Sequence, residues 1–162
     1  IADVIKNYGE ERYARRIARA IVSARDAKPI TTTAQLAEIV KSAHPRWERD
    51  RHPATRSFQG IRIFINQELE ALRAALDAVI DILQVGGRLV VISFHSLEDK
   101  IVKKFISLQT KGDIYPRGVP VAQDQLHPTM KPVGKAIRPE TAEVSANPRA
   151  RSAVMRVAEK IA

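Results

Sequence analysis

Seven consecutive residues, Ser93 to Asp99, combine hydroxyl, imidazole and carboxylate side chains. They come at the end of an apolar run, Arg88 to Phe94, which predicts a buried strand of the parallel-sheet type. Groups at the carboxyl end of such a strand face the ligand crevice of an open α/β sheet. We therefore take His95, Ser96 and Asp99 as candidate catalytic residues, with His95 as a substrate contact or proton carrier.

A structural interpretation of this segment competes with the catalytic one. Ser96 and Asp99 have the spacing of a helix cap, with Ser96 as the N-cap and Asp99 as the acid at the third helical position. Capping is the favoured interpretation for Ser96 and Asp99. For His95, a role in a functional site and a purely structural role are equally favoured. His95 and Ser96 are disfavoured as the catalytic pair of a hydrolase, because the sequence has no Gly-x-Ser-x-Gly elbow. No metal site is expected, because the four histidines are scattered without a partner at i+4.

Three groups of mostly basic side chains are candidate contacts to nucleic acid. Guanidinium groups match phosphate oxygens, and a mixture of Arg, Gln and Asn can contact both phosphates and base edges. The alternatives are ordinary solvated helix faces and, for the last group, a turn anchored by Asn147-Pro148. The candidate RNA-binding residues are Arg12, Arg16 and Arg19, then Arg56, Gln59, Arg62 and Asn66, and finally Arg149 and Arg151.

The elements that would position these groups alternate between helix and strand. Helical patterns cover 1–27, with a break at Tyr8-Gly9 that leaves Glu10 and Glu11 in the next helix's first turn, and a helix capped by Thr32 and Gln35 follows. A long helical pattern begins at Pro53 and ends at Leu83, with a break near Asn66. After Gly86-Gly87 we expect the strand 88–94, a helix at 97–108, an irregular proline-rich stretch at 109–150 and a closing strand at 152–159. Trp47, in a polar connector, is either a packing lid, the favoured role, or a base-stacking platform.

The composition favours a polyanionic partner. The 162 residues carry a net charge of +9, divided into +6 over residues 1–66, −4 over 67–99 and +7 over 100–162. Such an excess suits nucleic acid, because neutralised phosphates release counterions. The absence of cysteine excludes disulfides, thiolate zinc sites and cysteine catalysis, and fits a cytoplasmic location. No apolar run is long enough to span a membrane, and no signal peptide begins the sequence.

Several motifs occur together and in order: Tyr8 to Arg12, Arg16 to Ile21, His52 to Arg56, Asn66 to Leu69, Gly86 to Leu89, Ser93 to Asp99 and Asn147 to Ser152. This set resembles the bacterial S-adenosylmethionine-dependent methyltransferases that modify N4 of a cytidine in 16S ribosomal RNA. The likeness extends over nearly the whole chain. One departure is Gly60, where the family more often has alanine, and a glycine inside a helix permits a local kink.

The resemblance implies an α/β fold, namely the C-terminal half of a class I (Rossmann-like) methyltransferase domain with a mostly helical inserted substrate-recognition domain. Residues 1–60 would belong to the insertion, and residues 61–162, with the long loop at 109–150, to the methyltransferase domain. The cofactor would be S-adenosyl-L-methionine and the partner 16S rRNA of the small ribosomal subunit. The family's glycine-rich cofactor loop has no counterpart in the sequence, so its main binding motifs are expected upstream of Ile1 and no residue of this chain is assigned to the cofactor.

Other interpretations stay open at this point. We expect the chain to be part of a longer enzyme and inactive alone, since Ile1 stands inside a helical pattern. A non-enzymatic basic RNA- or DNA-binding module is the main alternative, with a loose helix-turn-helix pattern over 10–40. The strand at 88–94 and the proline-rich stretch disfavour that motif. A ribosome-assembly scaffold is a third alternative, and a homodimer is neither required nor excluded.

Overall fold

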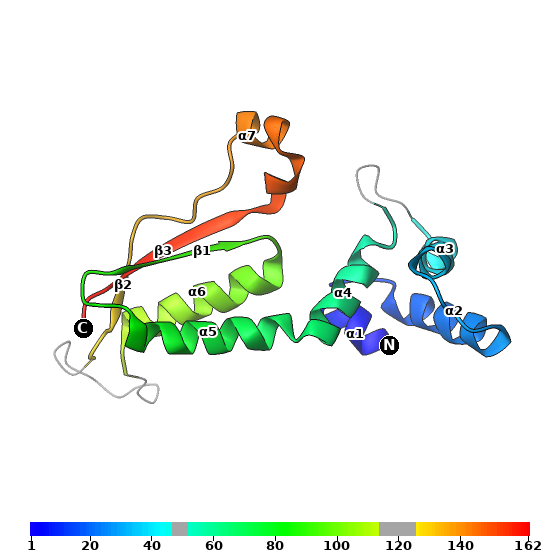
Figure 1. Cartoon of the computed structure of the whole chain (residues 1–162), viewed down its shortest axis with the longest axis horizontal. Coiled ribbons are helices and arrows are strands. Elements are labelled where there is room, and N and C mark those ends of the chain that lie inside the picture. The colour runs from blue at the N-terminus through cyan, green and yellow to red at the C-terminus, as the bar shows by residue number, and fades with distance from the viewer. Residues whose placement is uncertain (47–51, 114–125) are drawn as a thin grey trace. The chain divides into compact units, whose positions relative to one another are not determined.

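The computed structural model describes residues 1–46, 52–113 and 126–162. These residues form two compact units, Ile1–Glu68 and Leu69–Ala162. Trp47 lies outside the described residues, so its predicted role is not addressed by the structure. Figure 1 shows the order of the elements along the chain.

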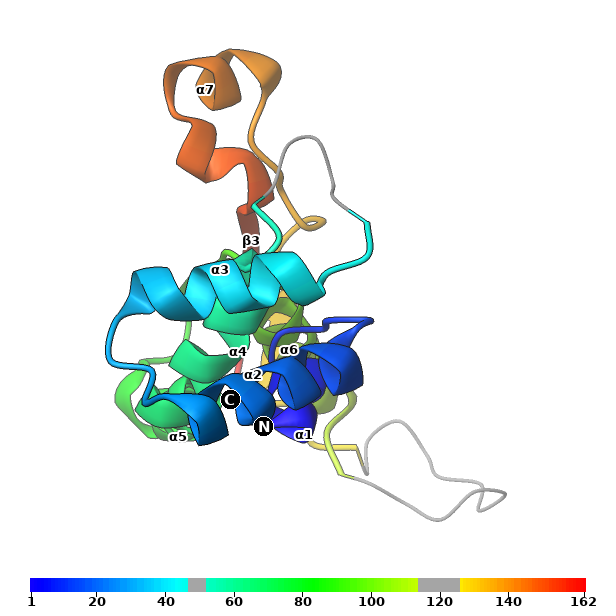
Figure 2. The ribbon, with the colours of Figure 1, turned by 90° about the vertical axis from the view of Figure 1, so that its right-hand side faces the viewer.

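The first unit is entirely helical in its described part. Its helices are α1 (Ala2–Asn7), α2 (Ala14–Ala27), α3 (Thr33–Ala43) and α4 (Thr55–Asn66). Helix α2 packs against α1 and α3, and α1 also packs against α4 (Figure 2). The apolar stripes of the amphipathic helices meet in one core. The buried residues of that core are Ile5, Ala14, Ile17, Ile21, Val40, Ala43 and Ala54.

The helix boundaries in this unit agree with most of the sequence signals. The predicted breaks occur after α1 and at Asn66, where Gln67 adopts a left-handed conformation with φ of 51°. Thr32 and Gln35 form the predicted capping box at the start of α3. The prediction for Glu10 and Glu11 was wrong, because α2 begins only at Ala14 and its first turn contains no acid.

Gly9 and Gly60 allow α4 to lie against the turn after α1. A Cβ atom on Gly60 would come within 2.8 Å of the Gly9 backbone nitrogen, and one on Gly9 would collide with the Arg56 carbonyl oxygen. Helix α4 continues without interruption past Gly60. The glycine at position 60 therefore serves close backbone packing rather than a break in the helix.

The second unit packs helices on a small sheet. It contains most of α5 (Glu68–Ile82), then β1 (Arg88–Ser93), α6 (Ser96–Lys111), β2 (Met130–Pro132), α7 (Thr141–Ala146), the 3₁₀-helix η2 (Pro148–Ser152) and β3 (Val154–Lys160). The strand order is β1-β3-β2, and β3 is antiparallel to both neighbours. Residues of α5 and α6 share a core with β2 and β3, built on Leu76, Val102, Phe105, Ile106, Met130 and Ala158.

The last turn of α5 and the turn that follows it are tied to the end of β3. The Lys160 ammonium donates to the carbonyls of Ile80 (2.7 Å) and Leu83 (3.0 Å), which α5 leaves unpaired at its C-terminus. Gly86, with φ of 85°, donates its N–H to the Lys160 carbonyl. The predicted Gly-Gly turn therefore joins α5 to β1 while β3 holds its backbone.

Two predictions for this unit need correction. The strand at 88–94 exists, but it pairs antiparallel with β3 and alternate residues are open to solvent: Val90, Ile92 and Phe94 are 53%, 54% and 55% exposed. The stretch 109–150 is not uniformly irregular, because it contains the end of α6, β2 and α7. Short elements with three to six residues carry too little periodicity to be recognised. The closing strand was predicted correctly, with its bounds shifted to Val154–Lys160.

Candidate nucleic-acid interface

The junction between β1 and α6 is a helix cap built on His95 and Glu98. The Glu98 N–H donates to His95 Nδ1 at 3.4 Å, and Glu98 Oε2 accepts the N–H groups of Phe94 (2.8 Å) and His95 (3.2 Å). This reciprocal arrangement is a capping box. The prediction that Ser96 and Asp99 form the cap was wrong by one residue: Ser96 is the first helical residue, and Asp99 lies one position beyond Glu98.

The His95 imidazole is held on both sides. Its side chain is 10% exposed, and Nε2 lies 3.3 Å from Glu98 Oε1. Since Nδ1 accepts a hydrogen bond, the neutral ring carries its proton on Nε2. That nitrogen makes no hydrogen bond to any of the described residues. Nε2 is also buried, so His95 is an oriented cap residue whose second ring nitrogen is enclosed by the protein at the strand end.

Asp99 is engaged in a two-point contact with Arg156. Arg156 Nε donates to Asp99 Oδ1 at 2.7 Å, and Nη2 donates to Oδ2 at 3.0 Å. These hydrogen bonds hold the pKa of Asp99 below its ordinary value, against the opposing effect of desolvation, and raise the pKa of Arg156. The carboxylate is consequently ionised near neutral pH and joins α6 to β3, which leaves it unsuited to donate a proton there.

The arginines at the start of unit 1 are exposed but do not form one continuous ridge. Arg12 precedes α2 and lies 5.8 Å from the centre of the Tyr13 ring. Arg16 lines a shallow hollow with α3, whereas Arg19 lines another with Ile1 and the first residues of α1. Neither Arg16 nor Arg19 forms a salt bridge with any of the described residues. Their charges are thus available on two neighbouring surfaces of α2.

The candidates on α4 divide into two pairs. Arg56 and Gln59 are half-buried near its N-terminus. Arg62 donates from Nε and Nη2 to the two carboxylate oxygens of Glu68, at 2.8 and 3.0 Å, and Asn66 Nδ2 donates to Glu68 Oε1 at 3.2 Å. Arg62 and Asn66 therefore stabilise the α4–α5 junction. Helical spacing does not reveal this pairing, because Glu68 lies beyond the end of α4.

The candidates near the C-terminus lie on η2. Arg149 and Arg151 are both exposed, and Asn147 Oδ1 accepts the Arg149 N–H at 3.2 Å. The alternative of a turn anchored by Asn147-Pro148 is therefore confirmed for the backbone. The anchored turn engages the backbone and leaves both arginine side chains exposed, so the turn and a phosphate contact are compatible.

The buried carboxylate of Glu11 was not predicted as a polar centre. Glu11 is only 2% exposed, accepts the Tyr13 N–H at 2.8 Å and lies 3.5 Å from His44 Nε2. It satisfies a backbone donor ahead of α2 and connects this turn to the end of α3. The two acids in succession could be recognised in the sequence, but not which of them is buried.

Within 1–46, 52–113 and 126–162, no three His, Asp or Glu side chains gather as ligands for a metal ion. Over the same ranges, every helix is too short or too polar to cross a membrane.

Comparison with known proteins extends over almost the whole chain. Residues 1–161 match the MraW methylase family. The chain is 59% identical over 162 residues to the protein named ribosomal RNA small subunit methyltransferase H of Chromohalobacter salexigens, covering 99% of this chain and 49% of that protein. Its identity to the protein of the same name from Legionella pneumophila strain Paris is 55%, covering 100% of this chain and 53% of the relative.

A third relative of that name, from Nitrosococcus oceani, is 59% identical over 161 residues, which are 99% of this chain and 51% of the relative. The chain thus spans about half the length of the curated relatives it matches. Since the family model covers nearly every residue of the chain, this protein belongs to the MraW methylase family.

Proposed function

We propose that the protein acts in the methylation of N4 of a cytidine in 16S ribosomal RNA, with S-adenosyl-L-methionine as methyl donor, in the cytoplasm. Membership of a methylase family and relatives named small-subunit rRNA methyltransferases support this proposal. The observation that carries the RNA contact is the pair Arg16 and Arg19, exposed on α2 without a salt bridge to the described residues. Such guanidinium groups suit RNA phosphates.

In this proposal residues 1–60 are the substrate-recognition insertion. Arg12, Arg16 and Arg19 hold the RNA backbone, with Arg56 and Gln59 on α4 as neighbouring contacts. Arg149 and Arg151, on the anchored η2 turn of the other unit, contact further phosphates. Arg62 and Asn66 act indirectly, because their bonds to Glu68 fix the end of α4.

The reacting group is a poor nucleophile, since the lone pair of the cytosine amine is delocalised into the ring. The base must leave its stack before the amine can meet a methyl donor. Catalysis would rest on holding the amine in line and on accommodating the charge of its departing proton. His95 at the end of β1, whose buried Nε2 makes no hydrogen bond to the described residues, is our candidate for a polar contact to the base. Asp99 is assigned a positioning role, through Arg156.

S-adenosyl-L-methionine supplies the methyl group as a sulfonium cation. Three hollows of the described residues offer a sulfonium cation little net negative charge, because Glu38 and Asp26 each line one of them together with arginine, and the third is lined only by cationic charged side chains. Like charges in a confined hollow repel. We therefore propose that its main contacts come from the part of the relatives that this chain does not span.

We further propose that residues 61–162 form the C-terminal part of a Rossmann-like sheet. Strands β1 and β2 are both antiparallel to β3 and hence parallel to each other. Antiparallel strands often occur at one side of doubly wound sheets. The apolar side chains of Val90 and Ile92 are exposed on β1, which has no partner on its other edge within the described residues. The open edge suits a sheet that continues beyond β1, and the exposed apolar side chains, which stand on one face of the sheet, suit a layer that covers that face.

The test uses a full-length protein containing this chain. It is incubated with isotopically labelled S-adenosyl-L-methionine and small-subunit RNA or subunits, and the modified nucleoside is identified by mass spectrometry. The proposal predicts label on N4 of a cytidine. Label on a different atom or base would reject the N4 assignment, and incorporation into protein alone would reject the RNA substrate.

A further inference from the structure

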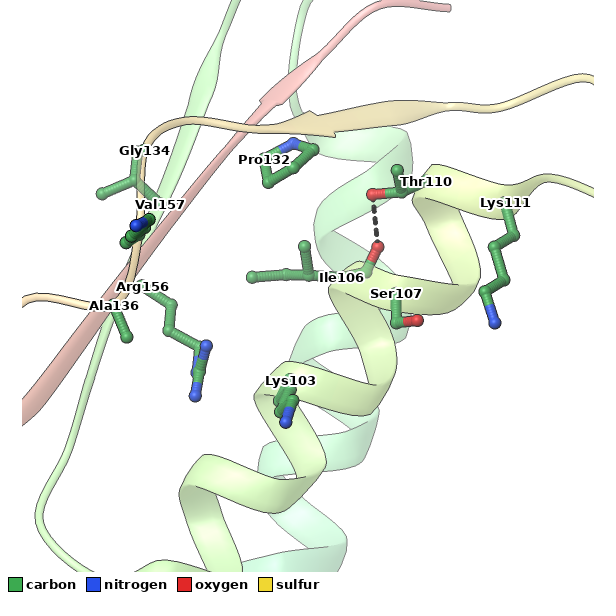
Figure 3. A pocket seen from close by; sticks show the side chains of 11 residues that line it. Lys103, Ile106, Ser107, Thr110, Lys111, Pro132, Gly134, Ala136, Arg156 and Val157 are labelled. Carbon is green, nitrogen blue, oxygen red and sulfur yellow. Dashed lines mark hydrogen bonds between the residues drawn. The ribbon is translucent and has the colours of Figure 1, made fainter.

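A basic hollow opens in the second unit between α6, β2 with the segment after it, and β3. Its volume is about 300 Å³. The charged side chains that line it are Lys103 and Lys111 of α6, Lys135 of the segment after β2, and Arg156 of β3. Figure 3 shows Arg156 extending from β3 toward α6, on the side of the helix that carries Lys103. None of the described residues lining the hollow is an aspartate or glutamate.

The positive charge of this hollow is only partly neutralised by the protein. Asp99 pairs with Arg156 through Nε and Nη2, so neither of the two bonds uses Nη1. Lys103, Lys111 and Lys135 form no salt bridge with any of the described residues. Lys103 is attracted to the Asp99 carboxylate without a direct salt bridge to it. The three ammonium groups around the hollow still repel one another, and an anion placed among them would relieve that repulsion.

The backbone beside the lysines adds hydrogen-bond donors. Val133 and Ile137 donate their N–H groups to β3, at 2.9 Å each, and Gly134 between them has φ of 71°. The N–H groups of Gly134, Lys135 and Ala136 make no hydrogen bond to any of the described residues. Successive free N–H groups around a residue with positive φ are a recurring setting for phosphate-like anions. Ser107, on the opposite wall, contributes an exposed hydroxyl.

We propose that this hollow binds a phosphate group of the RNA backbone. The inference deepens the proposed function and rests on it, adding an RNA contact on the second unit that is separate from the arginines of α2. Lysine ammonium groups act as point charges. They therefore suit contacts to backbone phosphates, which do not depend on RNA sequence, better than the recognition of a particular base. The three lysines are exposed, so the backbone of a long RNA can reach them. The hollow is also formed by residues 100–162, whose net charge of +7 attracts a polyanion.

The experiment measures binding of a fluorescent small-subunit RNA fragment to the full-length protein by anisotropy, over a series of salt concentrations. The test variant is Lys103→Ala/Lys135→Ala. The matched control is Lys100→Ala/Lys104→Ala, which removes the same charge from neighbouring positions of α6 that do not line the hollow. Circular dichroism and thermal unfolding confirm that both variants are folded. In a parallel arm, inorganic phosphate is titrated and followed by NMR of the amides of residues 134–136.

We expect the test variant to bind about tenfold more weakly at low salt and to lose about 1–2 from the slope of log affinity against log salt, with a smaller loss in the control. Equal losses in both variants, with strong salt-dependent binding by the unaltered protein, would overturn the hollow as an RNA site while leaving the proposed function in place. Binding of inorganic phosphate without any effect of the test variant on RNA affinity would reassign the site to a small phosphate compound. Absence of RNA binding by the unaltered protein would reject the proposed function itself.

Discussion

Asp99 of α6 and Arg156 of β3, 57 residues apart in the chain, are joined by two hydrogen bonds of 2.7 and 3.0 Å. Both side chains are about one-fifth exposed. The geometry is the planar, two-point match between a guanidinium and a carboxylate. It ties α6, the helix capped by His95, to the central strand of the sheet, and it sets the orientation of Arg156 at the basic hollow.

Replacing Asp99 should make the second unit less stable in a pH-dependent manner. The pKa of Asp99 is lowered in the folded protein by the Arg156 hydrogen bonds. Its contribution is therefore fully present above the ordinary value of 3.8 and is lost as the pH falls through the lowered pKa. We expect Asp99→Asn to cost about 1–2 kcal/mol at neutral pH. Urea unfolding at several pH values measures this.

The control for Asp99→Asn is Asp77→Asn on the exposed face of α5, which should leave the free energy of unfolding almost unchanged. The difference in stability between the unaltered protein and Asp99→Asn should shrink below pH 4. A difference that stays constant down to pH 2 would show that the ion pair is not its source.

The capping box predicts different roles for the neighbours His95 and Ser96. His95→Ala removes the acceptor for the Glu98 N–H and should lower the free energy of unfolding by about 1 kcal/mol. His95→Asn supplies a side-chain oxygen at the N-cap and should restore most of that stability. Ser96→Ala, one residue inside the helix, should cost less than His95→Ala. A larger loss for Ser96→Ala in chemical denaturation would contradict the observed cap.

His95→Asn also separates capping from a contact to the base. If the Nε2–H group serves the RNA substrate, this variant should stay as stable as the unaltered protein while methylation by the full-length enzyme falls. Undiminished methylation at full stability would limit His95 to its capping role.

Gly60→Ala tests the close approach of α4 to Gly9. In an ordinary helix interior this change stabilises by about 1 kcal/mol. Here the new Cβ would lie 2.8 Å from the Gly9 nitrogen and 3.1 Å from the Val4 carbonyl oxygen, both backbone atoms. We therefore expect a net loss of about 1–3 kcal/mol in the free energy of unfolding. A thermal shift upward would be the opposite of this expectation.

Gly134→Ala provides a comparison for Gly60→Ala. A Cβ at position 134 would meet no atom within 4 Å, although its φ of 71° disfavours alanine. Its cost should be limited to that backbone strain, about 1 kcal/mol.

The sequence indicated the positions of the longer helices and strands more reliably than which elements they pair with or pack against. Helices with several turns, such as α5 with its regular leucines, are recognisable because one apolar stripe repeats along them. The exposure of one face of β1 was not recognisable, because an apolar run of six or seven residues looks the same on a covered and an uncovered sheet face. The short elements β2 and α7 have too few residues to show a period.

The candidate site was predictable in composition but not in geometry. The importance of the Ser93–Asp99 segment was visible from its position after a strand, yet the cap shifted by one residue from Ser96 to His95. The pairing of Asp99 with Arg156 and that of Arg62 with Glu68 depend on the fold, so spacing alone could not reveal them. Lys103 and Lys135 come from distant segments and meet at one hollow only because β2 returns along β3.

The central claim, that the exposed cations of α2 contact RNA, is tested most directly by the salt dependence of RNA binding in matched variants of the 162-residue chain. The variant Arg16→Ala/Arg19→Ala is compared with Arg25→Ala/Lys28→Ala, which removes the same charge at and just after the end of the same helix. We predict that the first variant lowers the slope of log affinity against log salt by about 1–2, and the second by clearly less. Equal slopes in both variants, or a slope near zero for the unaltered chain, would contradict the claim.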